Sequence, residues 1–356
     1  MAKDIKLIRK EINEIDSKIK QLWLERLQCS KEIAEYKKEN NLPIFDASRE
    51  KEVINENSKD IKDPLIKKHY TNFLHSLMDI SKDYQNELNE SFKVGYCGVE
   101  GAFAHIASSN LYPNLEKKTY NNFENVFKAI IDKGIKKGVI PFENSYTGEV
   151  GEVLDLLLTY PLYIENIYSL EIKQNLIGIK GSKISDIKKI YTHSQAYNQC
   201  YDYLRDRGIE FTPFSNTALA AKHVKSKNDP SIACIASKET AQIYDLDIIA
   251  ENIHSSNLNQ TKFIVISDEL NPNGNRFNAL FTVDVGSGKL APIMNIIAKN
   301  GFNLESIRSR AVKNLPWQYY FYIEVEASLK DKKTQKLIEE LKENCQTFKV
   351  IGSYNV

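Results

Sequence analysis

The chain has 356 residues, of which 42% are hydrophobic and 27% are charged, the balance of a globular protein with two or three domains. With 48 Lys and Arg against 47 Asp and Glu, the net charge is +1, which excludes a global field that would attract nucleic acid or anionic lipid. The five scattered cysteines form no CxxC pair, and no apolar run of about 18 residues could span a bilayer, so we expect a cytoplasmic protein with reduced thiols, no metal site and no membrane partner.

A long helix is predicted from Ile5 to about Glu39, because this stretch lacks proline and glycine and its apolar residues recur at helical spacing until Pro43 ends it. The recurring positions are Ile5, Ile8, Ile12, Ile15, Ile19, Leu22 and Ile33. One step of the series falls on Arg26, which places a charge on the apolar face. Because a buried guanidinium without a counter-charge is unfavourable, Arg26 needs an anion from the protein or from a ligand.

The length of this helix indicates a second chain. At 1.5 Å per residue the helix spans about 54 Å, more than a compact unit of 90 residues can cover. Arg9 lies about 25 Å from Arg26 along the axis, so the two cannot hold one small molecule within one chain. In an antiparallel dimer of intertwined helices, Arg9 of one chain approaches Arg26 of the other. We therefore expect a homodimer, and whether dimers pair into a tetramer stays open.

Two shorter helices complete the first 90 residues. One is expected to begin near Asp46 or Ser48, both good cap residues. The other begins at Asp63-Pro64, a cap followed by proline, and runs to about Glu90. This part of the chain is therefore predicted to be entirely helical.

The charged and polar residues of these helices match a known pattern. They are Arg9, Asp16, Arg26, Lys37, Asp46, Arg49, Glu50, Ser81 and Gln85, with Pro43 between the first two helices. Their order and spacing resemble the all-helical chorismate mutase domain at the front of bifunctional chorismate mutase/prephenate dehydratase proteins. The resemblance covers residues 5 to about 90 and implies that chorismate rearranges to prephenate by a pericyclic shift, without nucleophile, metal or cofactor.

The resemblance also implies a role for each residue. The site must select the compact diaxial conformer of chorismate and stabilise charge on the breaking ether oxygen. Arg26 and, from the partner chain, Arg9 would hold the carboxylates, while Lys37 and Gln85 would donate to the ether oxygen. Around the ring hydroxyl and the carboxylates, the other expected chorismate-binding residues are Asp46, Arg49, Glu50 and Ser81.

Each of these residues alone also has an ordinary structural explanation. Arg26 could extend its charge to solvent or pair with a nearby carboxylate. Arg49 and Glu50 could form an exposed helix pair, and Ser81 with Gln85 one polar helix face. Eight positions in register across three helices favour the mutase.

The middle of the chain changes to strands alternating with helices, which predicts an α/β domain. Predicted strands are 92–98, 137–142, 170–179, 189–193, 231–236 and 261–267, and predicted helices include 195–206 and 217–226. Four polar stretches follow or adjoin strands, VIPFENSYTGEV (139–150), YTHSQA (191–196), SNTALAA (215–221) and NQTKF (259–263). Open α/β sheets bind ligands at strand ends, so these four stretches suggest one cleft.

These stretches, with GVEGAFAH (98–105), resemble in order the prephenate dehydratase domain over residues 93 to 268. The resemblance implies a two-lobed, periplasmic-binding-protein-like α/β fold with the active site between the lobes. One lobe would hold 93 to about 165 with 250–268, and the other about 170 to 248. The implied reaction removes carbon dioxide and the ring hydroxyl from prephenate to give phenylpyruvate.

Thr261 is the residue that the resemblance makes essential for this dehydration. A threonine hydroxyl is too weak an acid to work alone, so Glu143 or His193 is expected to supply the proton. The expected prephenate-binding residues are Asn144, Ser145, Ser194, Gln195, Asn216, Thr217, Lys262 and Phe263. Lys262 and Ser194 stand where the family usually has arginine and proline, and lysine lacks the planar fork of arginine.

The segment Asn271-Pro-Asn-Gly-Asn275 reads as a linker, and the order strand, helix, strand, strand, helix, strand after it predicts a ferredoxin-like βαββαβ fold. Residues 286–326 resemble the ACT domain, a regulatory module that binds L-phenylalanine in this enzyme class. The expected effector-binding residues are Gly288, Leu290, Asn303, Leu304, Ser309 and Arg310. Arg308 stands where phenylalanine-sensing members carry glutamate, which reverses a charge beside the expected pocket.

The chain is therefore predicted to be multidomain, with a mutase domain at 1–90, a dehydratase domain at 93–268 and an ACT domain at 276–356. One alternative couples the mutase to an oxidative prephenate dehydrogenase, but no G-x-G-x-x-G follows a strand. Another fuses the mutase to a non-catalytic module that senses aromatic amino acids. Products formed from chorismate would separate these alternatives.

Overall fold

The computed structural model describes residues 4–40, 42, 46–88, 92–256, 258–313, 315 and 317–356. Pro43, which the sequence makes the end of the first helix, lies outside the described residues. The chain divides into two compact units, Met1–Phe92 and Lys93–Val356, and each is described by itself.

The first unit consists of three helices, α1 (Ile5–Glu39), α2 (Ala47–Ser58) and α3 (Pro64–Glu87). Their starts follow from local capping. Asp46 Oδ1 accepts hydrogen bonds from the Ser48 and Arg49 amides, and Asp63 Oδ1 accepts from the Leu65 amide at 2.8 Å. The prediction that this part of the chain is helical is confirmed.

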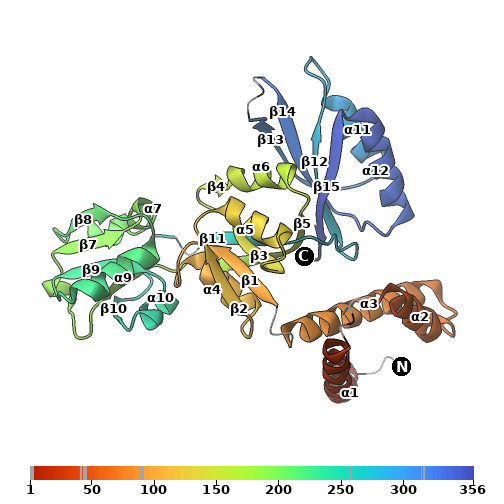
Figure 1. Ribbon diagram of the computed structural model, residues 1–356, viewed down its shortest axis with the longest axis horizontal. Helices are drawn as coiled ribbons and strands as arrows, with labels where there is room; N and C mark the ends of the chain where they lie inside the picture. Colours follow the sequence, from red (N-terminus) through yellow and green to blue (C-terminus); the bar gives the residue numbers. More distant parts are fainter. Residues whose placement is uncertain are drawn as a thin grey trace. The chain divides into compact units, whose positions relative to one another are not determined.

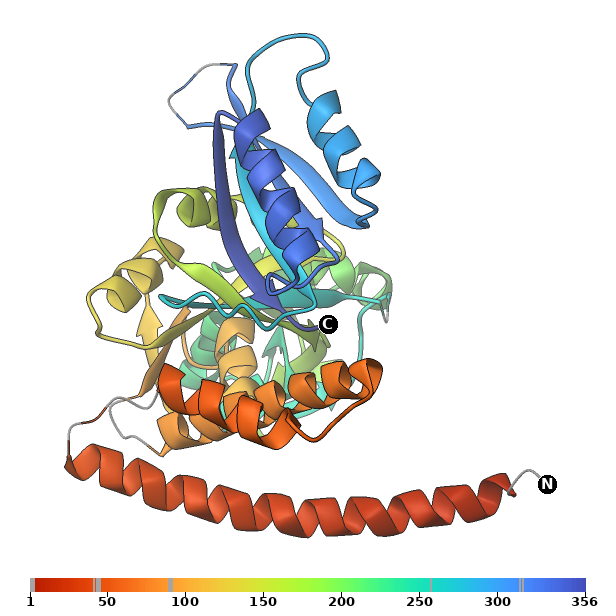
Figure 2. The same ribbon diagram turned by 90° about the vertical axis from the view of Figure 1, so that its right-hand side faces the viewer.

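Helix α1 is one uninterrupted helix (Figure 2), and most of its side chains are exposed. Ser30 is the one buried residue of α1, all of whose residues the structure describes. Its exposed apolar side chains include Ile5, Leu7, Ile8, Ile12, Ile15, Ile19, Leu22, Leu24 and Ile33. An apolar helix face of this length is normally buried against another element.

The second unit contains two lobes and a tail. The first lobe has strands β1 (Lys93–Cys97), β2 (Glu116–Tyr120), β3 (Lys137–Asn144), β4 (Gly148–Glu149), β5 (Tyr163–Glu171) and β11 (Gln260–Ser267). Its helices are α4 (Phe103–Leu111), α5 (Phe123–Ile131) and α6 (Gly151–Thr159). Strands β1, β2 and β3 pair in parallel, whereas β11 runs antiparallel to β3 and β5, so the sheet is mixed.

The second lobe has strands β6 (Asn175–Gly178), β7 (Lys189–Thr192), β8 (Glu210–Pro213), β9 (Ile232–Ala236) and β10 (Asp247–Ala250), in the order β10-β6-β9-β7-β8. Its helical segments are η1 (Ile184–Asp186), α7 (Ser194–Gln199), α8 (Tyr201–Leu204), α9 (Thr217–Lys227) and α10 (Lys238–Ile243). The chain enters this lobe between β5 and β6 and leaves it between β10 and β11.

Two predicted elements are divided in the structure. The strand predicted at 170–179 is interrupted at residues 172–174, where the chain crosses between lobes and the Ile172 amide donates to the Asn259 carbonyl. The helix predicted at 195–206 breaks at Cys200, which is fully buried. The prediction of an α/β domain is confirmed, and its first sheet is mixed.

The tail, residues 276–356, has β12 (Arg276–Thr282), α11 (Ala291–Lys299), β13 (Leu304–Ala311), β14 (Tyr319–Val325), α12 (Lys332–Asn344) and β15 (Thr347–Tyr354), the order βαββαβ. Helices α11 and α12 cover one face of its four-stranded sheet (Figure 1). The other face contributes Leu280, Tyr320, Tyr322 and Ile351 to the hydrophobic core of the first lobe.

One strand pairing joins the tail to the first lobe. Gly352 of β15 pairs with Ile164 of β5, so the strands follow the order β13-β14-β12-β15-β5-β11-β3-β1-β2 in one sheet. A Cβ at Gly352 would lie 2.5 Å from Ile164 Cβ and 2.6 Å from its carbonyl oxygen. This close approach requires glycine.

Candidate active sites

Arg26 reaches across the first unit to helix α3. Its Nη1 donates to the Ser81 hydroxyl and, at 3.3 Å, to the Leu77 carbonyl oxygen. Both partners are neutral, and burial lowers the pKa of Arg26. The guanidinium is thus half-buried with its charge uncompensated by these contacts, which is the setting of an anion-binding group.

Gln85 lies one helical turn after Ser81 on α3 and is 7% exposed. Among the described residues no donor reaches its buried Oε1. A buried amide oxygen without a partner is costly, so this residue points to a ligand or an ordered water in the completed site. Arg26 thus contacts Ser81, with Gln85 one turn further along α3, and the grouping of these three residues in one site stays a prediction.

Helix α2 and its cap carry two further acidic residues of the predicted mutase site, Glu50 and Asp46. Glu50 forms an ion pair with Lys82 at 2.7 Å, and Lys82 also binds Asp79 at 2.8 Å. The Arg49 amide and the Ser48 hydroxyl lower the pKa of Asp46, and the positive charge of Lys37 adds to this effect.

Two residues of the predicted mutase site, Arg49 and Arg9, do not lie beside Arg26 and Ser81 within one chain. Arg49 is exposed and pairs with Glu52 at 2.7 Å. Arg9 is exposed on the same continuous helix as Arg26, about 25 Å away along its axis. One chain alone therefore assembles only part of the residues that the sequence analysis grouped together.

In the second unit, Thr261 on β11 lies beside Asn144 on β3. Asn144 Nδ2 donates to Thr261 Oγ1 at 2.9 Å and to Asn259 Oδ1 at 2.9 Å. Asn144 Oδ1 accepts from the Tyr146 and Thr147 amides, so the amide group is fixed by a turn of its own. The Ser145 hydroxyl adds a bond to the Leu258 carbonyl at 2.9 Å.

The second lobe presents its candidate residues at two helix starts. His193 caps α7, and its Nδ1 accepts from the Gln195 amide at 3.2 Å, while Ser194 is exposed. Asn216 caps α9 through a 2.7 Å bond from the Leu219 amide, and Thr217 follows it. These residues lie after β7 and β8, at the strand ends where α/β sheets bind ligands.

A small cavity lies beside Asn259, which accepts a hydrogen bond from Asn144. It has a volume of about 140 Å³ and is lined by Tyr146, Asn198, Gln199, Tyr201, Asp202, His254, Ser255, Ser256 and Asn259. Tyr146 belongs to the first lobe and Asn198 to Asp202 belong to the second, so the cavity lies between the lobes. Within the described part of the chain, no cluster of His, Cys, Asp or Glu could hold a metal ion, and no helix is long and apolar enough to cross a bilayer.

Comparison with known proteins identifies both units. The family model for chorismate mutase type II matches residues 8–86, and the model for prephenate dehydratase matches residues 94–271. A bifunctional chorismate mutase/prephenate dehydratase from Aquifex aeolicus is 31% identical, over 99% of this chain and 98% of its own length. The chain belongs to the bifunctional chorismate mutase/prephenate dehydratase family.

Solved structures agree with this family assignment at the level of the fold. A prephenate dehydratase from Staphylococcus aureus matches with a TM-score of 0.66 and 26% identity, over 74% of this chain and all of that one. A prephenate dehydratase from Arthrobacter aurescens in complex with L-Phe matches with a TM-score of 0.67 and 23% identity, over 74% of this chain and 90% of that one. The family assignment does not favour a mutase fused to a non-catalytic sensor.

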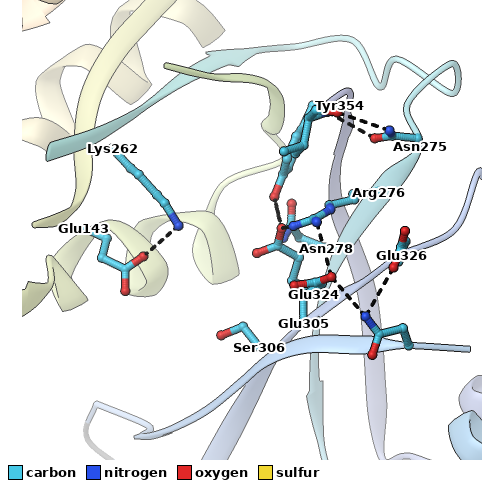
Figure 3. Close-up of polar contacts among 12 residues, drawn as sticks. Glu143, Lys262, Asn275, Arg276, Asn278, Glu305, Ser306, Glu324, Glu326 and Tyr354 are labelled. Carbon is cyan, nitrogen blue, oxygen red and sulfur yellow. Dashed lines mark hydrogen bonds and ion pairs between the residues drawn. The ribbon is translucent and has the colours of Figure 1, made fainter. Parts of the chain in front are cut away.

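Glu143, Lys262 and Phe263 complete the predicted dehydratase residues. Phe263 is 1% exposed and packs inside the protein. Lys262 lies 3.5 Å from Glu143 across strands β3 and β11 (Figure 3). Burial would raise the pKa of Glu143, but the hydrogen bond and charge of Arg308, with the charge of Lys262, outweigh it and hold the pKa below its ordinary value.

The expected effector residues do not all share one face of the tail sheet. Leu290 caps α11, and Gly288 before it has a φ of +76°. Asn303 binds Glu305 at 3.0 Å and Glu326 at 3.2 Å. Ser309 and Arg310 are neighbours on β13, so they point to opposite faces.

Arg310 faces the first lobe. It donates to Asp155 and Glu149, and Tyr320 donates to Asp155 at 2.6 Å. Sequence reasoning noted Arg308 only as a reversed charge near an effector pocket, whereas the structure pairs it with Glu143 at 2.7 Å. The sequence did contain a signal for this contact: Arg308 and Arg310 are two residues apart on β13, and residues two apart on a strand share a face.

Proposed function

We propose that the three-helix unit converts chorismate to prephenate and that the second unit converts prephenate to phenylpyruvate, as steps of phenylalanine biosynthesis. The observation that carries this proposal is the match of both family models to one chain, each over the unit that holds the corresponding residues. No cofactor is needed for either reaction, because one is a pericyclic shift and the other is driven by aromatisation.

In the mutase site, Arg26 binds one carboxylate of chorismate. This role is supported by its neutral partners, the Leu77 carbonyl and the Ser81 hydroxyl. Gln85 and Lys37 donate to the ether oxygen as the C–O bond breaks and the C–C bond forms in one step. Glu50, Asp46 and Arg49 are assigned to the ring hydroxyl side. Arg9 of the partner subunit completes the site.

A homodimer of intertwined α1 helices follows from this assignment. The support is the row of exposed apolar residues on α1, for example Ile12 at 49% and Ile15 at 53% exposure. A second copy of α1 is an occupant of matching length and apolar periodicity. We leave open whether such dimers pair further.

In the dehydratase site, prephenate loses carbon dioxide while its ring hydroxyl leaves as water. The electron pair of the breaking C–C bond enters the ring, and the departing hydroxide needs a proton. Asn144 donates to Thr261 Oγ1, so the threonine hydrogen is left to bind the substrate hydroxyl.

His193 is the better of the two candidates to assist the departing hydroxide, as a hydrogen-bond donor. Its Nδ1 accepts from the Gln195 amide, so in the neutral ring the hydrogen lies on the free Nε2. Glu143 is held ionised by Arg308 and Lys262, and an ionised carboxylate cannot donate. The substrate carboxylates are assigned to Ser145, Ser194, Gln195, Asn216, Thr217 and Lys262.

We assign the tail to the ACT domain, with domain boundaries at 1–90, 93–268 and 276–356, and L-phenylalanine as its ligand. Support comes from the βαββαβ order and from the L-Phe complex of the similar dehydratase. Gly288, Leu290, Asn303, Leu304 and Ser309 are the proposed contacts. Arg310 is assigned instead to the first lobe because its donors are engaged by Asp155 and Glu149.

The test is a product analysis with chorismate as substrate. The wild-type protein should form phenylpyruvate. Thr261→Val, which keeps the shape but removes the hydroxyl, should lower dehydratase turnover by about 100-fold or more while mutase turnover is kept. Unchanged phenylpyruvate formation by this variant would contradict the role of Thr261, and a wild-type protein that stops at prephenate would contradict the dehydratase.

A further inference from the structure

Arg308, on strand β13 of the tail, inserts its side chain between the tail and the first lobe. It is 20% exposed, and its Nη2 lies 2.7 Å from Glu143 Oε1. The guanidinium lies over two aromatic rings, Phe142 at 5.8 Å and Tyr322 at 5.5 Å. A partly buried ion pair flanked by two rings is held in a defined geometry, unlike a mobile surface pair.

The other partner, Glu143, directly precedes a residue of the proposed dehydratase site. Strand β3 pairs Glu143 with Lys262, but the next pair along is Pro141 with Phe263, so Phe142 is an extra residue that bulges the strand. Asn144, one residue on, binds Thr261 Oγ1 at 2.9 Å. The bulge interrupts the ladder with β11 beside Glu143, and backbone pairing resumes at Asn144, which pairs with Thr261 and with Gly148 of β4, so the side-chain contacts of Glu143 add to the backbone pairing that positions this strand end.

A second arginine of the tail, Arg310, binds residues that follow Glu143 in the chain. Arg310 donates to Glu149 at 3.1 Å and to Asp155 at 3.2 Å. Its guanidinium fills the space where a Cβ of Gly151 would lie, at the start of α6. The two arginines thus secure residues 143–155, which include the turn that carries Asn144 and Ser145.

Lys262 alone does not provide this anchoring. Its side chain is 52% exposed and its ammonium lies 3.5 Å from Glu143, a pair of the kind that contributes little to stability. Arg308 is closer and less exposed, and a second nitrogen, Nη1, lies 3.6 Å from Glu149. Arg308 is therefore the main partner of Glu143.

We propose that Arg308 is a positioning residue for the dehydratase reaction, which fixes Glu143 and thereby the Asn144 amide that orients the Thr261 hydroxyl. Glu143 is on this account an anchor and not the acid. The inference rests on the proposed dehydratase function. It makes the tail part of the machinery that shapes the site, even when no effector is bound.

The test compares Arg308→Gln with Arg276→Gln in the full-length protein. Arg276 is a matched control, because it also forms ion pairs in the tail, with Glu324 and Glu305, but touches no residue of β3 (Figure 3). Arg308→Gln should lower dehydratase kcat about 10-fold with little change in KM, since misplaced catalytic groups affect turnover first. Arg308→Lys should recover part of the loss, and Arg276→Gln should keep wild-type kcat. Mutase turnover should be unchanged in all three variants.

A double-mutant cycle checks that Arg308 acts through Glu143. If it does, Arg308→Gln should have almost no further effect on kcat in a Glu143→Gln protein. The inference would be overturned if the kcat loss of the double variant equalled the product of the two single losses. It would also be overturned if Arg308→Gln kept wild-type kcat. A wild-type protein that forms no phenylpyruvate would instead contradict the proposed function.

Glu143→Gln also provides a measurement that does not need Arg308→Gln to fold. An anchor predicts a drop in kcat of about 10-fold with an unchanged shape of the pH profile, because the geometry is loosened but the proton donor remains. Loss of the acid would remove one limb of the pH profile and abolish turnover. That second result would show that Glu143 is the acid and that the inference is wrong.

Discussion

At the scale of single residues, the mutase half depends on a charge in contact with neutral groups. Arg26 donates to a carbonyl and a hydroxyl, neither of which compensates its charge, and in our proposal a substrate carboxylate does so. Such a group is tolerated in the empty protein because it is only half-buried.

Arg26→Gln should therefore lower mutase kcat/KM by about 100-fold or more, because a carboxylate in a water-poor site loses its charged partner. Dehydratase turnover with added prephenate should be unchanged. Lys59→Gln removes a cation from the same unit, one that pairs with Glu56 on the surface, and should leave mutase activity at the wild-type level. Comparable losses in both variants would contradict the role of Arg26.

Asp155 gives a pH-dependent prediction. Burial would raise its pKa, but the hydrogen bonds from Tyr320, Arg310 and Lys313 outweigh burial and hold the pKa below its ordinary value. Because the folded-state pKa is lowered, the stabilisation is present above the unfolded-state pKa and is lost as the pH falls through the folded-state pKa.

Asp155→Asn should accordingly lower the free energy of unfolding by roughly 1–3 kcal/mol at neutral pH, as expected when one partner of a partly buried, hydrogen-bonded charged cluster is removed. The difference from wild type should shrink below about pH 4. Denaturant unfolding at several pH values measures both quantities. The exposed Asp206→Asn serves as control and should have no effect at any pH, whereas a difference that grows in acid would reverse the sign and sink the prediction.

At the scale of elements, local signals placed the helix starts well. Asp46 and Asp63 are caps in the structure as in the sequence, because an N-cap depends on residues only two or three positions away. The tail elements also follow the predicted order of strand, helix, strand, strand, helix and strand. The break at residues 172–174 was missed, since a crossing between lobes is determined by contacts such as Ile172 to Asn259, distant in sequence.

The same reasoning separates the predictable from the unpredictable site residues. The contact of Asn144 with Thr261 follows a motif pair recognised in the sequence. The contact of Arg308 with Glu143 joins residues 165 positions apart and depends on how the tail packs, which no local pattern reveals. Phe263 was grouped with substrate residues by its motif, but it is buried in the protein interior.

The pairing of β15 with β5 can be tested through its glycine. Gly352→Ala would place a Cβ against backbone atoms of Ile164, which cannot move aside as a flexible side chain could. We expect a loss of about 1–3 kcal/mol in unfolding free energy, typical of overpacking. Gly134→Ala, whose Cβ would meet only an ordinary 3.6 Å contact, should be close to neutral. Equal thermal stability of both variants would show that the pairing tolerates a side chain.

At the scale of the whole molecule, our proposal completes the mutase site with a second chain. Ile12→Lys with Ile15→Lys should convert the dimer to monomers, because two charges would be buried between the α1 helices. The monomers should lose mutase activity, since Arg9 no longer reaches a partner site, and keep dehydratase activity. Sedimentation measures the assembly.

Gln28→Lys is the control for this experiment. It adds the same charge to α1 at an exposed polar position off the apolar series. This variant should stay dimeric and active. A wild-type protein that sediments as a monomer with full mutase activity would contradict the shared site.

The shared sheet of the first lobe and the tail has a mechanical consequence. A module attached by a flexible tether can swing without disturbing its neighbour, but β15 is hydrogen-bonded to β5 in a continuous sheet. A change in the twist of the tail strands would therefore also change the twist of the neighbouring strands β5, β11 and β3, because all of them belong to one sheet. A ligand that rotates the tail strands by a few degrees would tilt the β3–β4 hairpin, which carries Asn144.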